Sequence, residues 1–202
     1  MSGPVRVWCL RHGESQNVTA QVAGTVPAAP LTEHGHSQAA DAAHALAAEP
    51  ITAVYVSTAL RAQQTAHPIA SAHGISVQVL PELAEIGIGR SEGSADPAVR
   101  ARTADVLRAW IVDGDLAQRV TDGESGHEVL ARMTAAFIHI ARHHPGHTVA
   151  VVGHVASLTT ALDRLCALYG LTWGTPLPHA EPFLIEWDGD HWRCPAWPTA
   201  ST

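Results

Sequence analysis

Short apolar runs alternate with longer segments of mixed polarity along most of the chain. The runs are rich in Val, Ile and Leu and lie at residues 5–10, 51–56, 75–80 and 148–152. Nearly continuous apolar runs of this length are typical of strands that are buried on both faces, as in a parallel sheet. Because segments with helical character separate the runs, the pattern predicts an α/β fold with a mainly parallel sheet.

Capping signals predict where the intervening helices begin. We expect helices from Thr32 to about Ala48, from Ser57 or Thr58 to Ala72, after the pair Asp96-Pro97, and after the capping-box residues Ser125 and Glu128. Pro68 lies inside the second helix and should kink or shorten it, because proline removes a backbone donor. Residues 11–30 are rich in Gly, Pro and small side chains and should form a loop.

Apolar residues at helical spacing predict which faces of the last two helices are buried. One helix carries Val129, Met133, Phe137 and Ile140 on a single face. The next helix should carry Leu158, Leu162, Leu165 and Tyr169, and Gly170 should end it. Residues 183–193 then predict a hairpin that turns at Asp188-Gly189.

The composition fits a single domain that spans residues 1–202, and it argues against several functions. Hydrophobic content is 46% and charged content 15%, which is typical of a globular chain. All 12 basic residues are Arg, so a Schiff-base lysine and a phosphate-loop lysine are both excluded. The net charge of −7 argues against a nucleic-acid surface. No run approaches the roughly 20 apolar residues of a membrane span, and no signal peptide is evident, so we expect a cytoplasmic protein without a membrane partner.

Cysteine and histidine spacing gives no sign of a metal site. Cys9, Cys166 and Cys194 lie far apart in the sequence, so we expect free thiols rather than a zinc site or a disulfide. No motif places histidines or carboxylates as metal ligands on one helix face. The sequence therefore predicts an activity that needs neither a metal nor a cofactor.

Polar segments follow three of the predicted strands. Arg11-His12-Gly13 follows the first strand, Ser57 to Arg61 follows the second, and Gly153-His154 follows the fourth. The carboxyl ends of parallel strands border the ligand site, so these segments should converge there. Neutral imidazole is a competent nucleophile toward phosphorus, a guanidinium holds phosphate oxygens in a fixed fork, and Gly13 lets backbone approach an anion. Each segment alone also fits a solvated or structural role, and together they favour phosphoryl chemistry.

A general acid is expected in the Gly-rich loop that begins at Glu85. A carboxyl group that donates a proton needs a raised pKa, which the apolar neighbours Ile86 and Ile88 would favour. Glu82 and Glu92 lie nearby in the sequence and compete for this role.

Taken in order, the motifs resemble those of the histidine phosphatase superfamily, in the branch that contains cofactor-dependent phosphoglycerate mutases and small broad-specificity phosphatases. The similar segments are Arg11-His12-Gly13-Glu14-Ser15, Leu31 to Ala39, Leu60 to Ala66, Glu85 to Gly93, Gly123-Glu124-Ser125 and Gly153-His154. The resemblance covers nearly the whole chain. It implies a three-layer α/β/α sandwich of the phosphoglycerate mutase-like type.

The resemblance also implies a role for each site residue. His12 would attack phosphorus and become a phosphohistidine, and Glu85 would donate a proton to the leaving oxygen. Arg11, Arg61 and His154 would bind the phosphoryl group of a small phosphorylated substrate.

Three positions depart from the pattern of this family. Asn17 lies one place before the position that Asn usually holds in the family, where this chain has Val18, so its contact with phosphate is an open expectation. Val155-Ala156 replaces the usual Gly-Gly and is expected to reshape the pocket wall. Ser91 stands where Trp is common, so the loop that carries Glu85 should pack differently.

The short segment 94–122, which should cap the site, favours hydrolysis. The mutases of the family usually carry a longer insertion there, which closes the pocket to water. We therefore expect a phosphatase, with a phosphoglycerate mutase as the alternative and a non-catalytic phospho-ligand binding protein as an alternative of another class. The sequence leaves open both the identity of the ester and the formation of a homodimer.

Overall fold

The computed structural model describes residues 3–198, which form helices and strands in alternation. In chain order these elements are β1 (Val5–Arg11), α1 (Gln16–Thr19), α2 (Glu33–Leu46), β2 (Ile51–Val56), α3 (Leu60–Ala72), β3 (Val77–Val79), the 3-10 turns η1 (Pro81–Leu83) and η2 (Gly89–Ser91), α4 (Pro97–Arg108), the π-helical turn η3 (Ala109–Asp113), α5 (Gly126–His143), β4 (Thr148–Gly153), α6 (Val155–Leu165), β5 (Phe183–Trp187) and β6 (Trp192–Arg193).

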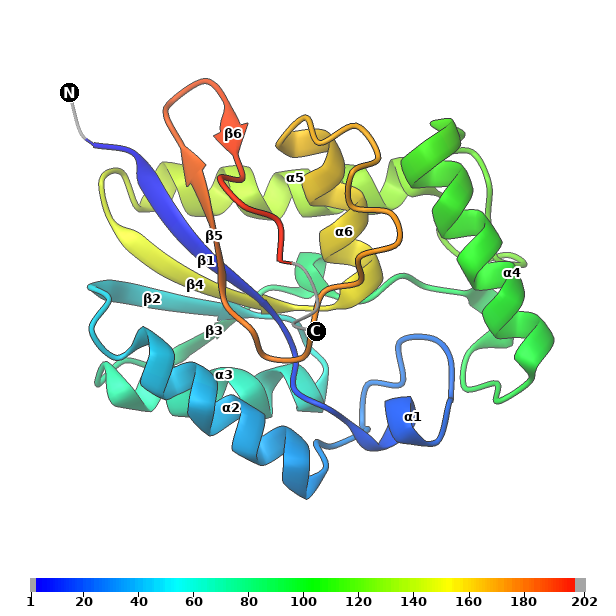
Figure 1. Cartoon of the computed structure of the whole chain (residues 1–202), viewed down its shortest axis with the longest axis horizontal. Coiled ribbons are helices and arrows are strands. Elements are labelled where there is room, and N and C mark those ends of the chain that lie inside the picture. Colours follow the sequence, from blue (N-terminus) through cyan, green and yellow to red (C-terminus); the bar gives the residue numbers. More distant parts are fainter. Residues whose placement is uncertain (1–2, 199–202) are drawn as a thin grey trace.

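A six-stranded sheet in the order β3-β2-β4-β1-β5-β6 forms the centre of the molecule (Figure 1). The four strands β3, β2, β4 and β1 are parallel, and the predicted hairpin of β5 and β6 extends the sheet in antiparallel fashion beside β1. Because β4 lies next to β1, Arg11 and Gly153 are direct partners in register. The segments that follow these two strands therefore begin side by side.

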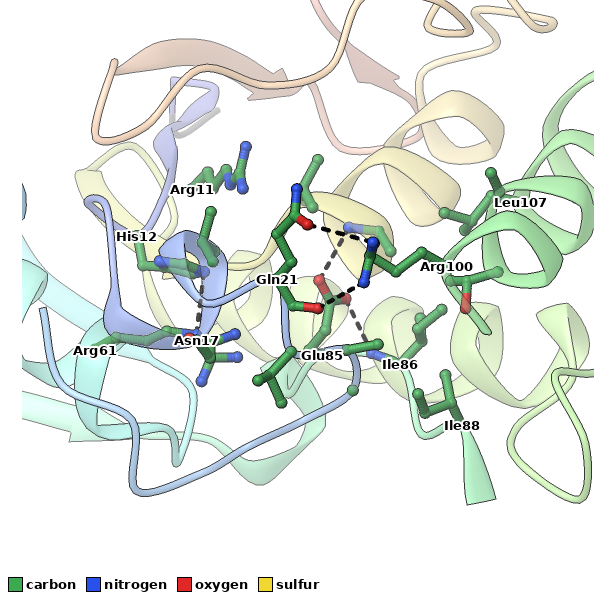
Figure 2. Close-up of a pocket in the computed structure, with 18 residues that line it drawn as sticks. Arg11, His12, Asn17, Gln21, Arg61, Glu85, Ile86, Ile88, Arg100 and Leu107 are labelled. Carbon is green, nitrogen blue, oxygen red and sulfur yellow. Dashed lines mark hydrogen bonds between the residues drawn. The ribbon is translucent and has the colours of Figure 1, made fainter. Parts of the chain in front are cut away.

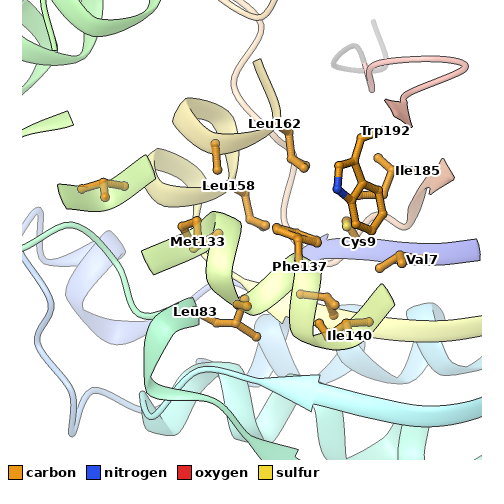
Figure 3. Packing of buried hydrophobic residues seen from close by; sticks show 14 of the residues in the cluster. Val7, Cys9, Leu83, Met133, Phe137, Ile140, Leu158, Leu162, Ile185 and Trp192 are labelled. Carbon is orange, nitrogen blue, oxygen red and sulfur yellow. The ribbon is translucent and has the colours of Figure 1, made fainter. Parts of the chain in front are cut away.

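Helices cover both faces of the sheet, α2 and α3 on one face and α5 and α6 on the other (Figure 1). Side chains of β1 alternate between the two faces: Val7 and Cys9 join the cluster under α5 and α6, and Leu10 joins the cluster under α2 and α3. Figure 3 shows the first cluster, in which Phe137 of α5 and Leu158 of α6 are fully buried. The structure thus confirms the predicted three-layer α/β/α fold.

Three predicted helix starts are confirmed by their N-capping hydrogen bonds. Thr32 accepts a hydrogen bond from the backbone of Gly35, Asp96 accepts one from Ala98, and Ser125 forms the predicted capping box with Glu128. The start of α3 differs from the prediction, because the helix begins at Leu60. Its predicted end at Ala72 is confirmed, and Pro68 does not shorten the helix, because Ile69 and Ala70 are buried against the sheet.

The end of α6 was predicted wrongly. The helix stops at Leu165, and Tyr169 lies on the following loop with 83% of its surface exposed. The buried carboxylate of Asp163 accepts hydrogen bonds from Gly170 N and Thr172 Oγ1, which turns the chain away before another helical turn can form. The short helix α1 was also missed within the predicted loop.

Two further expectations from the sequence concern the cysteines and membrane-spanning helices. Cys9 and Cys166 are buried free thiols, and Cys194 is a half-buried one. Within residues 3–198, no helix is both long enough and apolar enough to cross a membrane.

Candidate active site

A cavity of about 430 Å³ lies at the carboxyl ends of β1 and β4 (Figure 2). This volume is within the usual range for small-molecule sites. Five of the six predicted site residues line it, namely Arg11, His12, Asn17, Arg61 and Glu85. Because these residues come from β1, α1, α3 and the loop before α4, the cavity depends on the assembled sheet.

Hydrogen bonds define which ring nitrogen of His12 carries the lone pair. Nδ1 lies 2.7 Å from the carbonyl oxygen of Gly13, which can only accept, so Nδ1 carries the proton. Nε2 therefore holds the lone pair of the neutral ring, and it accepts a hydrogen bond of 3.1 Å from Nε of Arg61. Burial, reinforced by the positive charge of Arg61, holds the pKa of His12 well below its usual value. The imidazole is consequently neutral at physiological pH.

The side chain of Arg61 is almost completely buried, and hydrogen bonds to several groups hold it in place. Its Nη1 donates to the carbonyl oxygen of Val26 at 2.8 Å, and its Nη2 donates to that of Thr25 at 3.0 Å. The second residue of α3 is thus tied to the loop that follows α1. Burial lowers the pKa of Arg61. The network holds the guanidinium in one orientation beside His12.

His154 lies behind Arg61 rather than on the cavity surface. Its Nδ1 accepts from Nη2 of Arg61 at 3.3 Å, so Nε2 carries the proton and donates to Ser57 Oγ at 2.7 Å. The ring is fully buried, and its centroid lies 5.2 Å from that of His12. Burial holds the pKa of His154 well below its usual value. One ring nitrogen thus bonds to Arg61 and the other to Ser57, and the direct contact of His154 with phosphate that the sequence predicts stays a prediction.

Arg11 and Asn17 place further donors at the cavity. Nη1 of Arg11 donates to the carbonyl oxygen of Leu177 at 3.0 Å, and burial lowers its pKa to about 10, so the side chain still carries its charge at neutral pH. Oδ1 of Asn17 accepts from Ser15 Oγ at 2.8 Å, which leaves its NH₂ group as the donor. The site therefore combines two guanidinium groups and an amide donor, all suited to an anion.

Glu85 occupies the N-terminus of α6. Its Oε1 accepts from the backbone N–H groups of Ile86 and Ser157, both at 2.9 Å, and its Oε2 accepts from Ala156 N at 3.2 Å. Oε2 thus has the greater remaining hydrogen-bonding capacity. The carboxyl group meets the cavity beside buried Ile86 and Ile88.

Two other carboxylates near the site, Glu92 and Glu14, have different partners. Glu92 accepts from the backbone and hydroxyl of Thr25 and from Ile88 N, so it ties the loop after α1 to the loop that carries Glu85. Glu14 accepts from Thr32 Oγ1 at 2.7 Å. Of the carboxylates within residues 3–198, only Glu85 lines the cavity.

Sequence reasoning missed Arg132, which holds the loop of Glu85 from α5. Its guanidinium donates to the carbonyl oxygens of Glu82 and Ala84 at 2.7 Å and to that of Glu85 at 3.3 Å. It also pairs with both carboxylate oxygens of Glu124, which in turn accepts from Gly87 N at 2.7 Å. The nearest signal in the sequence is the segment Gly123-Glu124-Ser125, which resembles the family pattern but does not point to Arg132.

Gly13 has a different role from the one predicted. A Cβ atom at this position would lie 2.6 Å from the carbonyl oxygen of Gly35, so glycine is needed for close packing against α2. The backbone N–H of Gly13 donates to Thr65 Oγ1 at 3.0 Å and is not directed at an anion.

Comparisons with known proteins identify related sequences and a shared fold. The chain is 32% identical over 178 residues to the Yersinia enterocolitica protein named "Probable phosphoglycerate mutase GpmB", covering 88% of this chain and 78% of that protein. It is 29% identical over 165 residues to the adenosylcobalamin/alpha-ribazole phosphatase of Escherichia coli, covering 81% and 80%. Its fold matches the solved structure of mycobacterial glucosyl-3-phosphoglycerate phosphatase with a TM-score of 0.82 at 23% identity, covering 96% and 99%.

The family assignment rests on nearly the full length of the chain. Residues 7–199 match the histidine phosphatase superfamily (branch 1), a span that includes every site residue described above. The chain therefore belongs to branch 1 of the histidine phosphatase superfamily.

Proposed function

We propose that the protein is a phosphatase that hydrolyses a small-molecule phosphate monoester through a phosphohistidine at His12. The observation that carries this proposal is the neutral His12, whose Nε2 lone pair faces the guanidinium of Arg61 in a cavity that also holds Glu85. The phosphatase names of the Escherichia coli relative and of the structurally similar mycobacterial protein support hydrolysis.

The first chemical step uses the Nε2 lone pair of His12, which turns from the Nε–H of Arg61 to phosphorus. Nε2 attacks phosphorus in line, the new P–N bond forms, and the bond to the ester oxygen breaks. Arg11 and Arg61 neutralise the charge on the phosphoryl oxygens. Once Nε2 is bonded to phosphorus, the Nε–H of Arg61 has lost its acceptor and donates to a phosphoryl oxygen instead. The Nδ1–H bond to Gly13 stabilises the positive charge that the ring acquires.

Glu85 donates a proton in the first step and accepts one in the second. Its protonated form donates from Oε2 to the leaving oxygen, and the resulting carboxylate then removes a proton from water. That water attacks phosphorus, the P–N bond breaks, and inorganic phosphate leaves with His12 neutral again. His154 acts as a positioning residue for Arg61, and Arg132 acts as one for the loop of Glu85.

Glu85→Gln should reduce hydrolysis of alkyl phosphates by about 10²- to 10⁴-fold, the usual contribution of a general acid. It should affect p-nitrophenyl phosphate much less, because nitrophenolate leaves without a proton. Steady-state kcat/KM for the two substrates measures the difference. Glu82→Gln is the control, since its carboxylate does not line the cavity. Equal losses on both substrates would assign the acid role to another group.

The arginines of the cap segment, residues 94–122, and of its neighbourhood are engaged with protein partners. Nη1 of Arg100, at the cavity edge, donates to the carbonyl oxygens of Gln21 and Ala95, and its Nη2 donates to Oε1 of Gln21 (Figure 2). The other pairs are Arg90 with Asp122, Arg102 with Gln118, Arg108 with Asp113, and Arg119 with Glu128. A mutase must hold both ends of a bisphosphorylated intermediate in near-attack geometry, and this arrangement offers little for the second end.

Incubation with 3-phosphoglycerate and a bisphosphoglycerate primer should distinguish hydrolysis from isomerisation. We expect inorganic phosphate to be the main product from accepted esters, and its release should not need the primer. The measurement follows 2-phosphoglycerate and free phosphate together. Isomerisation that outruns phosphate release by about a hundredfold, equivalent to about 2.7 kcal/mol in barrier height, would establish the mutase instead.

A further inference from the structure

A second cavity of about 300 Å³ adjoins the site of phosphoryl transfer. Leu107 of α4, together with Val155 and Ala156 at the start of α6, lines both cavities. The two spaces therefore meet across these three apolar side chains. Val155 and Ala156 stand at the two positions where the family usually has glycine, so their side chains add apolar surface at the junction.

The second cavity is apolar and uncharged. Beyond the junction its walls include Ile111 of η3 and Trp173 and Pro176 of the loop after α6. Its hydroxyl-bearing residues are Thr159 and Thr172, and Thr172 donates to Asp163. Thr159 Oγ1 is buried without a hydrogen-bond partner and could satisfy one hydroxyl group. A group with several hydroxyls or with a negative charge would lose its hydration without gaining enough partners.

The acid residue Glu85 contacts a residue of the junction between the two cavities. Ala156 donates its backbone N–H to Oε2 of Glu85, the oxygen that protonates the leaving group in the proposed mechanism. The side chain of the same residue lines both cavities. An alcohol that takes its proton from Oε2 would therefore leave beside Ala156, at the junction that Leu107 and Val155 also line. Ile86 and Ile88 make the near side apolar as well.

We infer that the substrates are phosphate monoesters whose alcohol carries an alkyl or aryl group, and that this group occupies the second cavity. The inference rests on the proposed phosphatase function and names the substrate class of that site. An apolar alcohol would pack against the apolar junction. It would also need no cation besides those that bind the phosphoryl group, which agrees with the observation that the cap arginines are bonded to protein partners.

A series of n-alkyl phosphates from ethyl to octyl tests the inference. The leaving alcohols have nearly equal basicity, so differences in kcat/KM report binding of the chain. We expect kcat/KM to rise by about two- to fourfold for each added methylene until the cavity is filled, since burial of a methylene favours binding. Hexyl phosphate should also exceed a hexitol phosphate of the same chain length. The corresponding alkylphosphonates should inhibit in the same order, which gives a readout independent of turnover.

Variants locate the chain in the second cavity. Trp173→Ala should cause a loss in kcat/KM that grows from ethyl to octyl phosphate, and Leu107→Asn should do the same at the junction. Leu171→Ala is the matched control, because Leu171 lies on the same loop, is 78% exposed and lines neither cavity. Thermal unfolding of each variant checks that the fold is retained.

The outcomes separate this inference from the proposed function. Hydrolysis of all the alkyl esters with no dependence on chain length, or a preference for the hexitol phosphate, would overturn the apolar substrate class alone. A failure to hydrolyse any ester, including p-nitrophenyl phosphate, would overturn the phosphatase function on which the inference rests. Losses in Trp173→Ala that are equal for every chain length would remove the second cavity from the binding site.

Discussion

His12→Ala should lower kcat/KM for every phosphate ester by at least about 10⁴-fold, because the intermediate cannot form without the nucleophile. Nε2 of His12 carries the lone pair that attacks phosphorus in the proposed mechanism. The imidazole ring of His12 stays neutral because burial and the charge of Arg61 lower its pKa. Brief exposure of the wild-type protein to substrate with a labelled phosphoryl group should yield a protein-bound label that is stable in base and labile in acid. Peptide mapping should place that label on His12.

A neighbouring imidazole provides the control for this experiment. The ring centroid of His179 lies 5.6 Å from that of His12, and its Nδ1 donates to the His12 carbonyl oxygen at 2.9 Å. His179→Ala should reduce activity modestly and leave the label on His12. Label on a serine or aspartate, or substantial turnover by the His12→Ala protein with its fold intact, would refute the phosphohistidine mechanism.

Arg61→Lys should lower kcat/KM by about 10²- to 10³-fold even though the charge is retained, comparable to the loss of a preorganised transition-state donor. An ammonium group cannot reproduce the planar fork that reaches His12, Val26 and Thr25 at once. The variant should therefore weaken both phosphate binding and the loop after α1. Arg142→Lys, at an exposed position of α5, should leave kcat/KM unchanged.

Arg61→Met tests the electrostatic part of the same interaction. The positive charge of Arg61 lowers the pKa of His12, so its removal should raise that pKa toward the usual histidine value. His12 would then become protonated, and inactive as a nucleophile, at a higher pH. The acid limb of the kcat/KM profile should consequently move to higher pH in Arg61→Met and less so in Arg61→Lys. An unshifted limb in both variants would show that Arg61 does not tune His12.

The architecture could be predicted from the sequence because local patterns and tertiary packing agree over most of the chain. The apolar face of α5, for example, is buried where its spacing predicts. The prediction failed for α6, where Tyr169 continues the apolar spacing but the buried Asp163 ends the helix. Hydrogen bonds from the loop to a single buried side chain, such as those that Asp163 accepts, leave no periodic signal in the sequence.

Arg11, His12 and Arg61 could be predicted because they lie at a strand end or a helix start at the same edge of the sheet. Asn17 and Glu85 were predicted through segments that resemble the motifs of the family. The depth of His154 and the loop contacts of Arg132 could not be predicted, because both depend on distances between elements that are remote in sequence. Val155-Ala156 was expected to alter the pocket wall, and the structure places both side chains at the junction of two cavities. The roles assigned to the individual residues remain predictions that the variants above test.

The position of β4 in the sheet determines when the site can assemble while the chain is being synthesised. Among the described strands, β1 pairs with β4 and β5, both of which come from the last third of the chain. A chain that emerges from the ribosome N-terminus first therefore presents Arg11 and His12 long before their strand has a partner. Pairing over such a separation is slow, since a long loop must close first. A product truncated before Thr148 carries His12, Arg61 and Glu85 but lacks the strand that brings them together.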